Sequence, residues 1–420
     1  MDNESPKIIE KIAFLINWPR ELDMIRPLLK ELNDDEFDIV MNDASGRDLL
    51  ALKSIESFIE NKNHSDNIVR LSDINKISEY MSVVSTGLGP IRVITIRSTV
   101  LYIYAHLIGR FFSTRFMKKI LGIGVARKLM SGGRYRDLKG ELYIERDIAR
   151  NRICFPAELD KNISGYPNKK WRKVFDTFFS ISSFDKKLLE KHNVRNILPI
   201  GYPRFDNVIN IDKSRKKIMS EFNIPDSGNR KKIIFWSPTI TEYNGSGNQN
   251  IDFWKGYFSN ILKYYIVIVR PHPKSIINHP EMVVELKKLG LYVDSSESRE
   301  LSTLYGISDL VVADYGESLL TAIYLEKALI LLNLPKNADF NLHREGINGI
   351  VAVVRNDIPK IEYGAQFSEF QRIIRKSLSN KHNAVEEIKN IKNKYGLAKE
   401  TTSGVSDAVV YLRNILKNHD

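Results

Sequence analysis

Short apolar runs alternate with amphipathic stretches along almost the whole chain, and this order restricts the fold more than any single motif does. The strand-like runs fall at residues 11–18, 37–43, 151–158, 174–183, 231–239, 264–273, 291–296, 309–318 and 328–335. Between them lie stretches whose apolar residues recur every three or four positions, which is helical spacing. Strands and helices in turn are typical of parallel sheets with crossover helices, so we expect an α/β fold.

The chain has 420 residues, which is more than one hydrophobic core usually serves. We expect two Rossmann-like domains that face a cleft, with residues 1–205 as the first domain and residues 206–390 as the second. A Gly-Tyr-Pro segment at 201–203 would form the joint between them. Helical patterns near the C-terminus, with a last helix in 391–420, are expected to pack back across this joint.

A basic segment at residues 109–139 is prominent in a chain of net charge +12. The segment holds nine Lys or Arg residues and one acid, Asp137, and its apolar residues follow helical spacing. A basic amphipathic helix is typical of attachment to an anionic membrane surface, although a solvated helix packed on its own domain has the same pattern. Nucleic acid is not expected as a partner, because the sequence has neither zinc-ligand spacing nor an aromatic and basic sheet signature.

The compartment is predicted from the cysteine content and from the apolar runs. A single cysteine, Cys154, excludes a disulfide framework within the chain. No run reaches the roughly 18 apolar residues that span a bilayer, and the first residues do not have the pattern of a signal peptide. We therefore expect a cytoplasmic protein that is soluble or peripheral to the membrane.

Three strand-like runs of the second half end in turns that are suited to an anion. The turns are 237–239, 270–273 and 314–318, and the last one leads directly into a helix. Ligands of open parallel sheets bind beyond the carboxyl ends of the strands, where these turns would meet. The predicted ligands of a phosphate or pyrophosphate at this edge are Ser237, Thr239, His272, Gly316, Glu317 and Ser318.

Two prolines, Pro271 and Pro273, fix the backbone on both sides of His272. A histidine held in this way can direct an N–H group or a positive charge toward a leaving phosphate, which makes His272 a candidate catalytic residue. The alternative is that the segment is only a turn. The histidines show no metal-ligand spacing, so neither a metal nor a cofactor is expected.

Four segments follow one another within residues 150–335: GYPRFDNV, FWSPT, VRPHP and SDLVVADYGESLLTAIYLEKALILL. In order and approximate spacing they resemble segments of the CDP-glycerol glycerophosphotransferases of teichoic acid and capsule synthesis. The resemblance implies a GT-B-like fold, peripheral attachment at the inner face of the plasma membrane, a cytidine-nucleotide donor on the second domain and a glycan or lipid-linked acceptor on the first. The family's His-Pro histidine and the residues after its Asp-Tyr contact the donor phosphates. They correspond here to His272 and, more loosely, to Gly316, Glu317 and Ser318.

The sequence departs from this family at two points. The family's catalytic base is a histidine in a His-Gly-Thr-Pro segment, and the corresponding strand end here, CFPAELDKN, offers Glu158, with Asp160 as the second candidate. Glu158 has the alternative of a surface carboxylate. The family's Ser-Ser after Asp-Tyr is replaced by Gly316 and Glu317, which places an acid beside the phosphate site.

A carboxylate base combined with a His-Pro histidine also resembles bacterial transferases that use CMP-linked ulosonic acids, the sialyltransferases and the Kdo transferases. Both donors therefore stay open, and so does an inactive nucleotide-binding partner of a synthase. Arg204 is expected in the cleft, where it pairs with Asp206 or neutralises donor charge, and Arg270 is expected to line the cleft as well. We expect Asp314 to order its turn and Trp236 to lie in the core.

Overall fold

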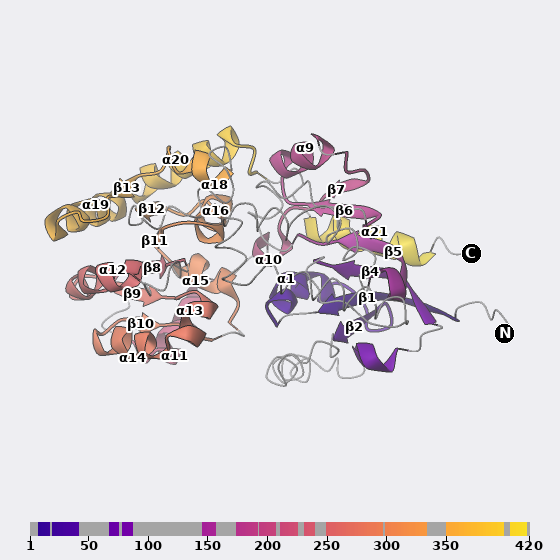
Figure 1. Ribbon diagram of the computed structural model, residues 1–420. Helices are drawn as coiled ribbons and strands as arrows, with labels where there is room; N and C mark the ends of the chain where they lie inside the picture. The colour runs from indigo at the N-terminus through magenta and orange to yellow at the C-terminus, as the bar shows by residue number, and fades with distance from the viewer. Residues whose placement is uncertain are drawn as a thin grey trace, which may run out of the picture.

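The computed structural model describes residues 7–16, 19–41, 67–74, 78–86, 145–156, 174–191, 193–206, 211–225, 231–239, 249–296, 299–333, 350–398 and 404–417. Within these residues the chain forms two sheets that lie side by side, with helices around them (Figure 1). Every strand pair in the two sheets is parallel. The expected α/β fold with two parallel sheets is confirmed.

The first sheet has seven strands in the order β3-β2-β1-β4-β5-β6-β7. Its strands are β1 (Lys7–Ile16), β2 (Phe37–Met41), β3 (Ile68–Arg70), β4 (Ser78–Ser85), β5 (Ala149–Cys154), β6 (Thr177–Ser180) and β7 (Ile197–Pro199). The helices of this half are α1 (Pro19–Leu29), the 3-10 helix η2 (Leu71–Asp73), α7 (Glu145–Ile148), α9 (Ser183–Lys191) and, at the joint, α10 (Pro203–Asp206). The middle strand, β4, was not among the predicted strands.

The second sheet has six strands in the order β10-β9-β8-β11-β12-β13. Its strands are β8 (Ile233–Ser237), β9 (Ile266–Val269), β10 (Tyr292–Val293), β11 (Leu310–Ala313), β12 (Leu329–Leu332) and β13 (Lys360–Ile361). The helices of this half are α11 (Ile211–Glu221), α12 (Gln249–Asn260), α13 (Pro273–Asn278), α14 (Pro280–Lys288), α15 (Leu301–Ile307), α16 (Glu317–Tyr324), α18 (Ile350–Val354), α19 (Phe367–Ser379) and α20 (Lys381–Lys394).

Strand β8 shows why the strands of the second sheet are continuously apolar. Ile233 and Phe235 lie in one hydrophobic cluster, and Ile234 and Trp236 lie in another. Alternate residues of a strand point to opposite faces, so both faces of this sheet are covered. Trp236 is fully buried and stacks on Phe258 with the ring centroids 4.2 Å apart, which agrees with its expected place in the core.

The last helix, α21 (Gly404–Lys417), packs on the first sheet and not on the second. Ala408 and Leu412 lie in the hydrophobic cluster that includes buried residues of β1 and β2. The hydroxyl groups of Tyr411 and Thr177 share a hydrogen bond of 2.8 Å, which ties α21 to the start of β6. The expected return of the C-terminal part of the chain across the joint is therefore confirmed.

Two glycines lie where the outgoing and the returning chain cross. A Cβ atom on Gly404 would lie only 1.5 Å from the carbonyl oxygen of Ile200 and 3.4 Å from the nitrogen of Gly201. The φ angle of Gly201 is 74°, in the left-handed region that favours glycine. The helix α21 can therefore begin in direct contact with the backbone of the joint only because it begins with a glycine.

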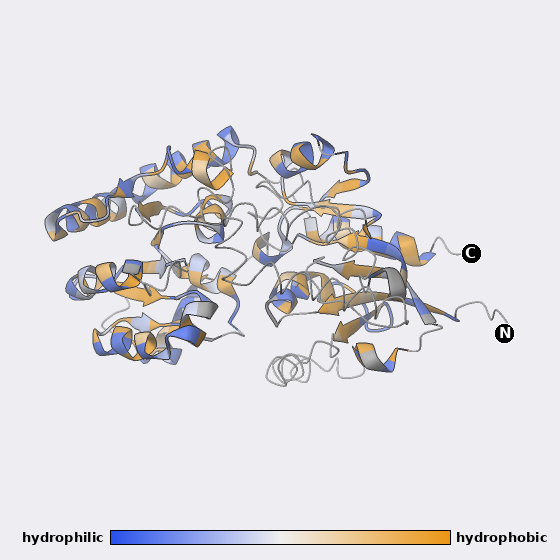
Figure 2. Cartoon of the chain, in the orientation of Figure 1, coloured by the Kyte–Doolittle hydropathy of each residue, from blue (hydrophilic) through white to orange (hydrophobic). Residues whose placement is uncertain are grey.

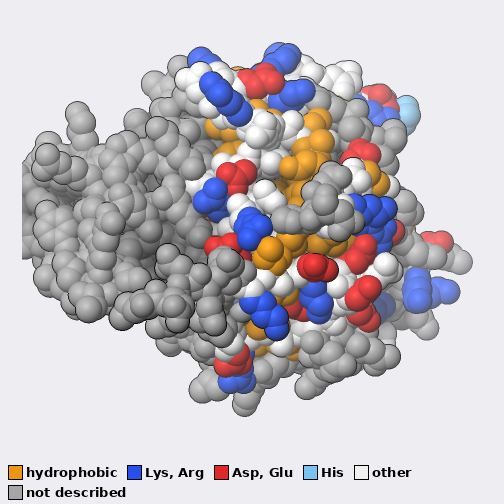
Figure 3. Space-filling view, turned by 90° about the vertical axis from the view of Figure 1, so that its right-hand side faces the viewer, with side chains coloured by type: hydrophobic (Ala, Val, Ile, Leu, Met, Phe, Trp, Pro, Cys, Tyr) orange, Lys and Arg blue, Asp and Glu red, His pale blue; other side chains and the backbone are white. Residues whose placement is uncertain are grey.

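The distribution of side chains follows from this architecture. Hydrophobic residues concentrate on the strands, whereas α19 and α20 alternate between hydrophobic and hydrophilic residues (Figure 2). On the face drawn in Figure 3, the described Lys, Arg, Asp and Glu side chains are interspersed and are not gathered by sign. The basic segment 109–139 lies outside the described residues. Among the helices of the described part, none has the length and apolar content that a membrane crossing requires.

Candidate active site

Three turns follow three neighbouring strands of the second sheet, in the spatial order β9-β8-β11. These strands pair in register almost to their last residues, so the turns begin at the same level of the sheet. The structure thus places Ser237 and Thr239 between His272 on one side and Gly316 on the other. A Cβ atom on Gly316 would lie 4.0 Å from the hydroxyl oxygen of Thr239, so these two turns are in contact.

The turn after β9 is a helix start and not an open loop. The carbonyl oxygen of His272 accepts hydrogen bonds from the N–H groups of Ser275 at 2.8 Å and Ile276 at 3.2 Å. Pro273 takes the first position of α13, where the missing N–H group costs nothing. Pro271 is buried and His272 is half-buried. The backbone of the candidate histidine is therefore fixed at the carboxyl edge of the sheet.

The turn before α16 is shaped by Gly316, whose φ angle of 81° and ψ angle of −150° are accessible mainly to glycine. Ser318 lies in the first turn of the helix, and its hydroxyl donates to the carbonyl oxygen of Tyr315 at 3.3 Å. Tyr305 donates its hydroxyl to the carbonyl oxygen of Ser318 at 3.0 Å. A helix N-terminus built in this way favours an anion through its N–H groups and its dipole.

Asp314 is fully buried directly beneath these turns. Its Oδ1 accepts hydrogen bonds from the N–H groups of Thr239 at 2.9 Å and Tyr315 at 2.7 Å, and its Oδ2 accepts from the side-chain amide of Asn250. Burial raises the pKa of Asp314 to about 6, although these hydrogen bonds act in the opposite direction. The carboxylate orders its turn, as expected, and it also orders the neighbouring turn.

The carboxylate of Glu317 contacts residues of the joint between the two domains. Its Oε1 accepts a hydrogen bond of 3.0 Å from the hydroxyl of Tyr202 and lies 3.7 Å from Nη1 of Arg204. Both partners belong to the Gly-Tyr-Pro-Arg joint. This acid, which the sequence places beside the phosphate site, therefore has a cationic and a hydroxyl partner, and it ties the start of α16 to the joint.

Arg204 connects this joint to the first domain. Its Nε donates to Oδ2 of Asp23 on α1 at 2.6 Å, and its side chain is 10 % exposed. Burial alone would lower the pKa of Arg204, but the negative charges of Asp23 and Glu317 raise it above the ordinary value. The side chain of Asp206, the partner considered from the sequence, lies outside the described residues, and Asp23 is a partner that sequence reasoning missed.

Replacing Asp23 by asparagine is expected to lower the midpoint of thermal unfolding. The change leaves a mostly buried guanidinium without its closest charged partner, and a charge-assisted hydrogen bond contributes about 1.5–3 kcal/mol. Scanning calorimetry of D23N beside the wild type measures this loss. The exposed Asp35, which follows the same helix, supplies the control, since D35N should leave the midpoint unchanged. Equal midpoints for D23N and D35N would contradict a stabilising role for the Arg204 pair.

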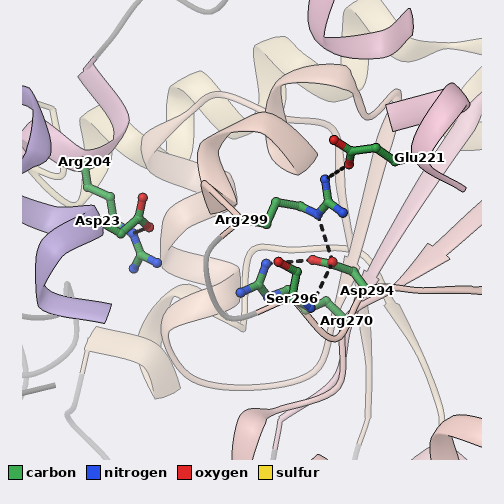
Figure 4. A network of polar contacts seen from close by, with 7 residues as sticks. All are labelled: Asp23, Arg204, Glu221, Arg270, Asp294, Ser296 and Arg299. Carbon is green, nitrogen blue, oxygen red and sulfur yellow. Dashed lines mark hydrogen bonds and ion pairs between the residues drawn. The ribbon is translucent and has the colours of Figure 1, made fainter. Parts of the chain in front are cut away.

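Arg270 lies in a second charged network (Figure 4). Its Nη1 donates to the buried Asp294 at 2.7 Å, and Asp294 also accepts from Nε of Arg299 at 2.8 Å. Arg299 forms a further ion pair with Glu221. Burial lowers the pKa of Arg270, and the positive charge of Arg204 lowers it further, against the opposing effect of Asp294. The two arginines that were expected in the cleft therefore act on each other electrostatically.

The carboxyl edge of the first sheet holds two buried acids that sequence reasoning missed. Thr86 donates its hydroxyl to Glu21 at 2.8 Å, and the preceding Ser85 donates to Glu145 at 2.6 Å. The predicted base candidates, Glu158 and Asp160, lie outside the described residues. Among the residues that the structure describes, no group of His, Cys, Asp and Glu side chains is arranged to hold a metal ion.

Comparison with known proteins bears directly on this edge of the second sheet. Residues 160–320 match a family model, and the matched part includes the three turns and the first residues of α16. That family is the CDP-glycerol:poly(glycerophosphate) glycerophosphotransferases. The resemblance seen in the sequence is therefore confirmed, and the matches give no support to the alternative of a CMP-sugar transferase.

Two curated relatives match part of this chain at low identity. They are the teichoic acid ribitol-phosphate polymerases TarK and TarL of Staphylococcus aureus (strain NCTC 8325 / PS 47), which are 24% and 25% identical over 145 and 146 residues. Each match covers 32% of this chain. It spans only 26% of TarK and 24% of TarL, so this chain is matched to about a quarter of either relative.

Solved structures show how far the fold is shared. The wall teichoic acid polymerase TagF matches with a TM-score of 0.61 at 13% identity, over 99% of this chain and 91% of that one. A UDP-GlcNAc 2-epimerase from Neisseria meningitidis, solved with UDP-GlcNAc, matches with a TM-score of 0.50 at 13% identity, over 97% of this chain and 100% of that one. At such identities the likeness concerns the fold, and the expected GT-B-like arrangement of two Rossmann-like domains is confirmed.

Proposed function

We propose that this chain transfers glycerol phosphate from CDP-glycerol to a glycan or lipid-linked acceptor in the synthesis of a bacterial surface polymer such as teichoic acid or capsule. One observation carries the proposal: the family match at residues 160–320 includes the turns of His272 and Thr239 and the start of α16, which follow three neighbouring strands of the second sheet. A TagF structure is described as soaked with CDPG, which supports a cytidine-nucleotide donor for this fold.

In this proposal an acceptor hydroxyl oxygen attacks the phosphorus that carries the glycerol. The bond from that phosphorus to the bridging oxygen breaks, and CMP leaves with the electron pair. His272 and the helix N-terminus at Gly316 and Ser318 stabilise the charge that develops on the leaving phosphate. Ser237 and Thr239 contribute hydroxyl groups beside them. Arg204 and Arg270 offset the negative charge of the donor from the side of the joint.

The acceptor and its base are assigned to the first domain. Glu158 is the proposed base that removes the hydroxyl proton, with Asp160 as the second candidate. Segment 109–139 is the proposed contact with an anionic membrane surface at the inner face of the plasma membrane. Sedimentation with phosphatidylglycerol vesicles tests this contact, and equal recovery with neutral phosphatidylcholine vesicles would contradict it.

The donor is tested by following the release of CMP from the purified chain with a short glycan or lipid-linked acceptor. CDP-glycerol is compared with a cytidine-activated ribitol phosphate, which the names of the relatives suggest, and with CMP-Kdo and CMP-sialate. We expect release from CDP-glycerol above all others. Release from the CMP-sugars alone would overturn the proposal, and nucleotide binding without any turnover would indicate an inactive partner of a synthase.

A further inference from the structure

We propose that Asp314 is a positioning residue of the donor site, whose ionised carboxylate fixes the turn at Thr239 against the turn that begins α16. The inference rests on the proposed function, because that function assigns both turns to the donor phosphates. It adds a residue that would contact no phosphate itself. It also predicts a dependence of donor binding on the protonation of one buried acid.

The geometry that carries the proposal is the convergence of three elements on one side chain. Asp314 accepts from the N–H group of Thr239 with both oxygens, at 2.9 and 3.1 Å, and from the N–H group of Tyr315 at 2.7 Å. The amide of Asn250 donates to Oδ2 from the first turn of α12. The carboxylate therefore holds the turn after β8, the start of α12 and its own turn in one arrangement.

An acid at the opposite end of β11 shows what a structural carboxylate looks like in this sheet. Asp309 accepts from the N–H group of Ile233 at 2.9 Å, at the start of β8, and from Nζ of Lys381 at 2.9 Å. Although burial acts in the opposite direction, the hydrogen bond from Lys381 and its charge keep the pKa of Asp309 below its ordinary value. The same two strands thus have an acid at each end: Asp309 contacts a lysine in addition to a backbone N–H group, whereas Asp314 accepts from backbone and side-chain amide N–H groups.

The charged groups around Asp314 are Arg355, after α18, and Glu317, at the start of α16. Arg355 lowers the pKa of Asp314 from a distance, while its Nη2 donates to Asn333 at 2.8 Å and its guanidinium lies over the ring of Tyr315. Glu317 is held by Tyr202. Within the described part of the chain neither group pairs directly with Asp314, and the hydrogen bonds to its carboxylate come from N–H groups.

The pH dependence of folding stability distinguishes a positioning role of the Asp314 carboxylate from a stabilising one. Burial raises the pKa of Asp314 from 3.8 to about 6, so the folded chain takes up this proton more readily than the unfolded chain does. The folded state therefore becomes less stable, not more, as the pH rises through the interval between these values. Above pH 6 the ionised form accepts all its hydrogen bonds, whereas a protonated oxygen would face an N–H group and release one of the turns.

The variant D314N removes the charge of the side chain but keeps its size, so the variant is expected to fold. The introduced amide keeps one acceptor oxygen. If the amide of Asn250 turns over, the new NH2 group can donate to its Oδ1, which is buried without a hydrogen bond among the described residues. D309N is the matched control, because it alters an acid of the same strand at the edge away from the donor site. H272Q is the second control, because a histidine also titrates near pH 6.

Two measurements test the proposal. The first is hydrogen exchange of peptides covering residues 235–239 and 313–318, without any ligand. The second is calorimetric titration with CDP-glycerol from pH 5 to pH 8, where a diphosphate esterified at both ends has no phosphate proton to lose, unlike a phosphate monoester with its second pKa near 6. We expect faster exchange in both peptides for D314N, and about tenfold weaker binding at pH 7.5. Wild type and H272Q should lose affinity below pH 6, and D314N should not.

The outcomes distinguish this inference from the proposed function. Wild-type exchange and wild-type affinity in D314N would overturn the role of Asp314, and so would an equal loss of affinity in D309N, since that would be a general effect of destabilising the sheet. If H272Q did not lose affinity for CDP-glycerol below pH 6, the pH dependence would belong to His272 and not to Asp314. A wild-type chain that does not bind CDP-glycerol at any pH would refute the proposed donor, and the exchange result would then decide whether Asp314 holds the turns.

Discussion

Replacing His272 by alanine should lower the rate of CMP release from CDP-glycerol by about a hundredfold or more, the scale of one lost donor to a developing oxyanion. The structure fixes the backbone of this residue between a buried proline and the first turn of α13, at the edge where three turns follow neighbouring strands. In the proposed mechanism, an imidazole in this place stabilises the leaving phosphate without being reordered during the reaction. The variant H272A keeps the backbone of the turn and loses the imidazole.

The matched control for this change is His279, the next histidine along the chain. It lies outside the three turns, directly before α14, and its Nδ1 lies 3.3 Å from the carboxylate of Glu281. H279A should release CMP at the wild-type rate. The measurement is a steady-state assay of both variants after circular dichroism has shown that they are folded. A folded H272A variant with wild-type activity would remove the histidine from the mechanism.

Replacing Gly404 by alanine should be the most destabilising single change that this structure identifies at a glycine of the described residues. The added Cβ atom would lie 1.5 Å from the carbonyl oxygen of Ile200 and 2.5 Å from its carbonyl carbon, so α21 would have to move away from the joint. That movement would withdraw Ala408 and Leu412 from the core of the first sheet. We expect a loss of about 3 kcal/mol or more, as for other changes that overpack a buried contact.

Gly256 provides the comparison for this prediction, because it is also a helical glycine and a Cβ atom there would have no neighbour within 4 Å. G256A should match the wild type or gain about 0.5–1 kcal/mol from the higher helix propensity of alanine. Urea denaturation followed by fluorescence compares the two variants. If G404A unfolded at the same urea concentration as G256A, the close approach of α21 to the joint would be wrong.

The fold of the second domain could be predicted because its strands are buried on both faces and therefore read as continuous apolar runs. The first domain was harder to predict, because one of its strands does not have a continuous apolar run. Strand β4 carries Ser78, Glu79, Ser82 and Ser85 among its apolar residues, so it lacks such a run although it lies in the middle of its sheet. Helix α12 was missed too, since its apolar and aromatic residues do not form a simple stripe with polar residues opposite.

The candidate site was predictable to the extent that it depends on topology. The carboxyl ends of neighbouring parallel strands must meet, so the turns at Thr239, His272 and Gly316 could be grouped before any contact was known. The partners of individual side chains could not be predicted, because they are distant in the sequence. Asp23 is 181 residues from Arg204, and Thr239 is 75 residues from Asp314. Only folding brings these pairs together.

The path of α21 has a practical consequence for anyone who divides this chain into fragments. A fragment that stops at residue 206 lacks α21, which covers one side of β1. A fragment that stops at residue 398 also lacks α21, so a cut near the C-terminus destabilises the amino-terminal half. The amino-terminal half therefore cannot be cloned as one uninterrupted stretch that includes everything it needs. A stable version of the amino-terminal half would carry residues 404–417 joined through a new linker. Limited proteolysis near the C-terminus would likewise report on the stability of the first domain.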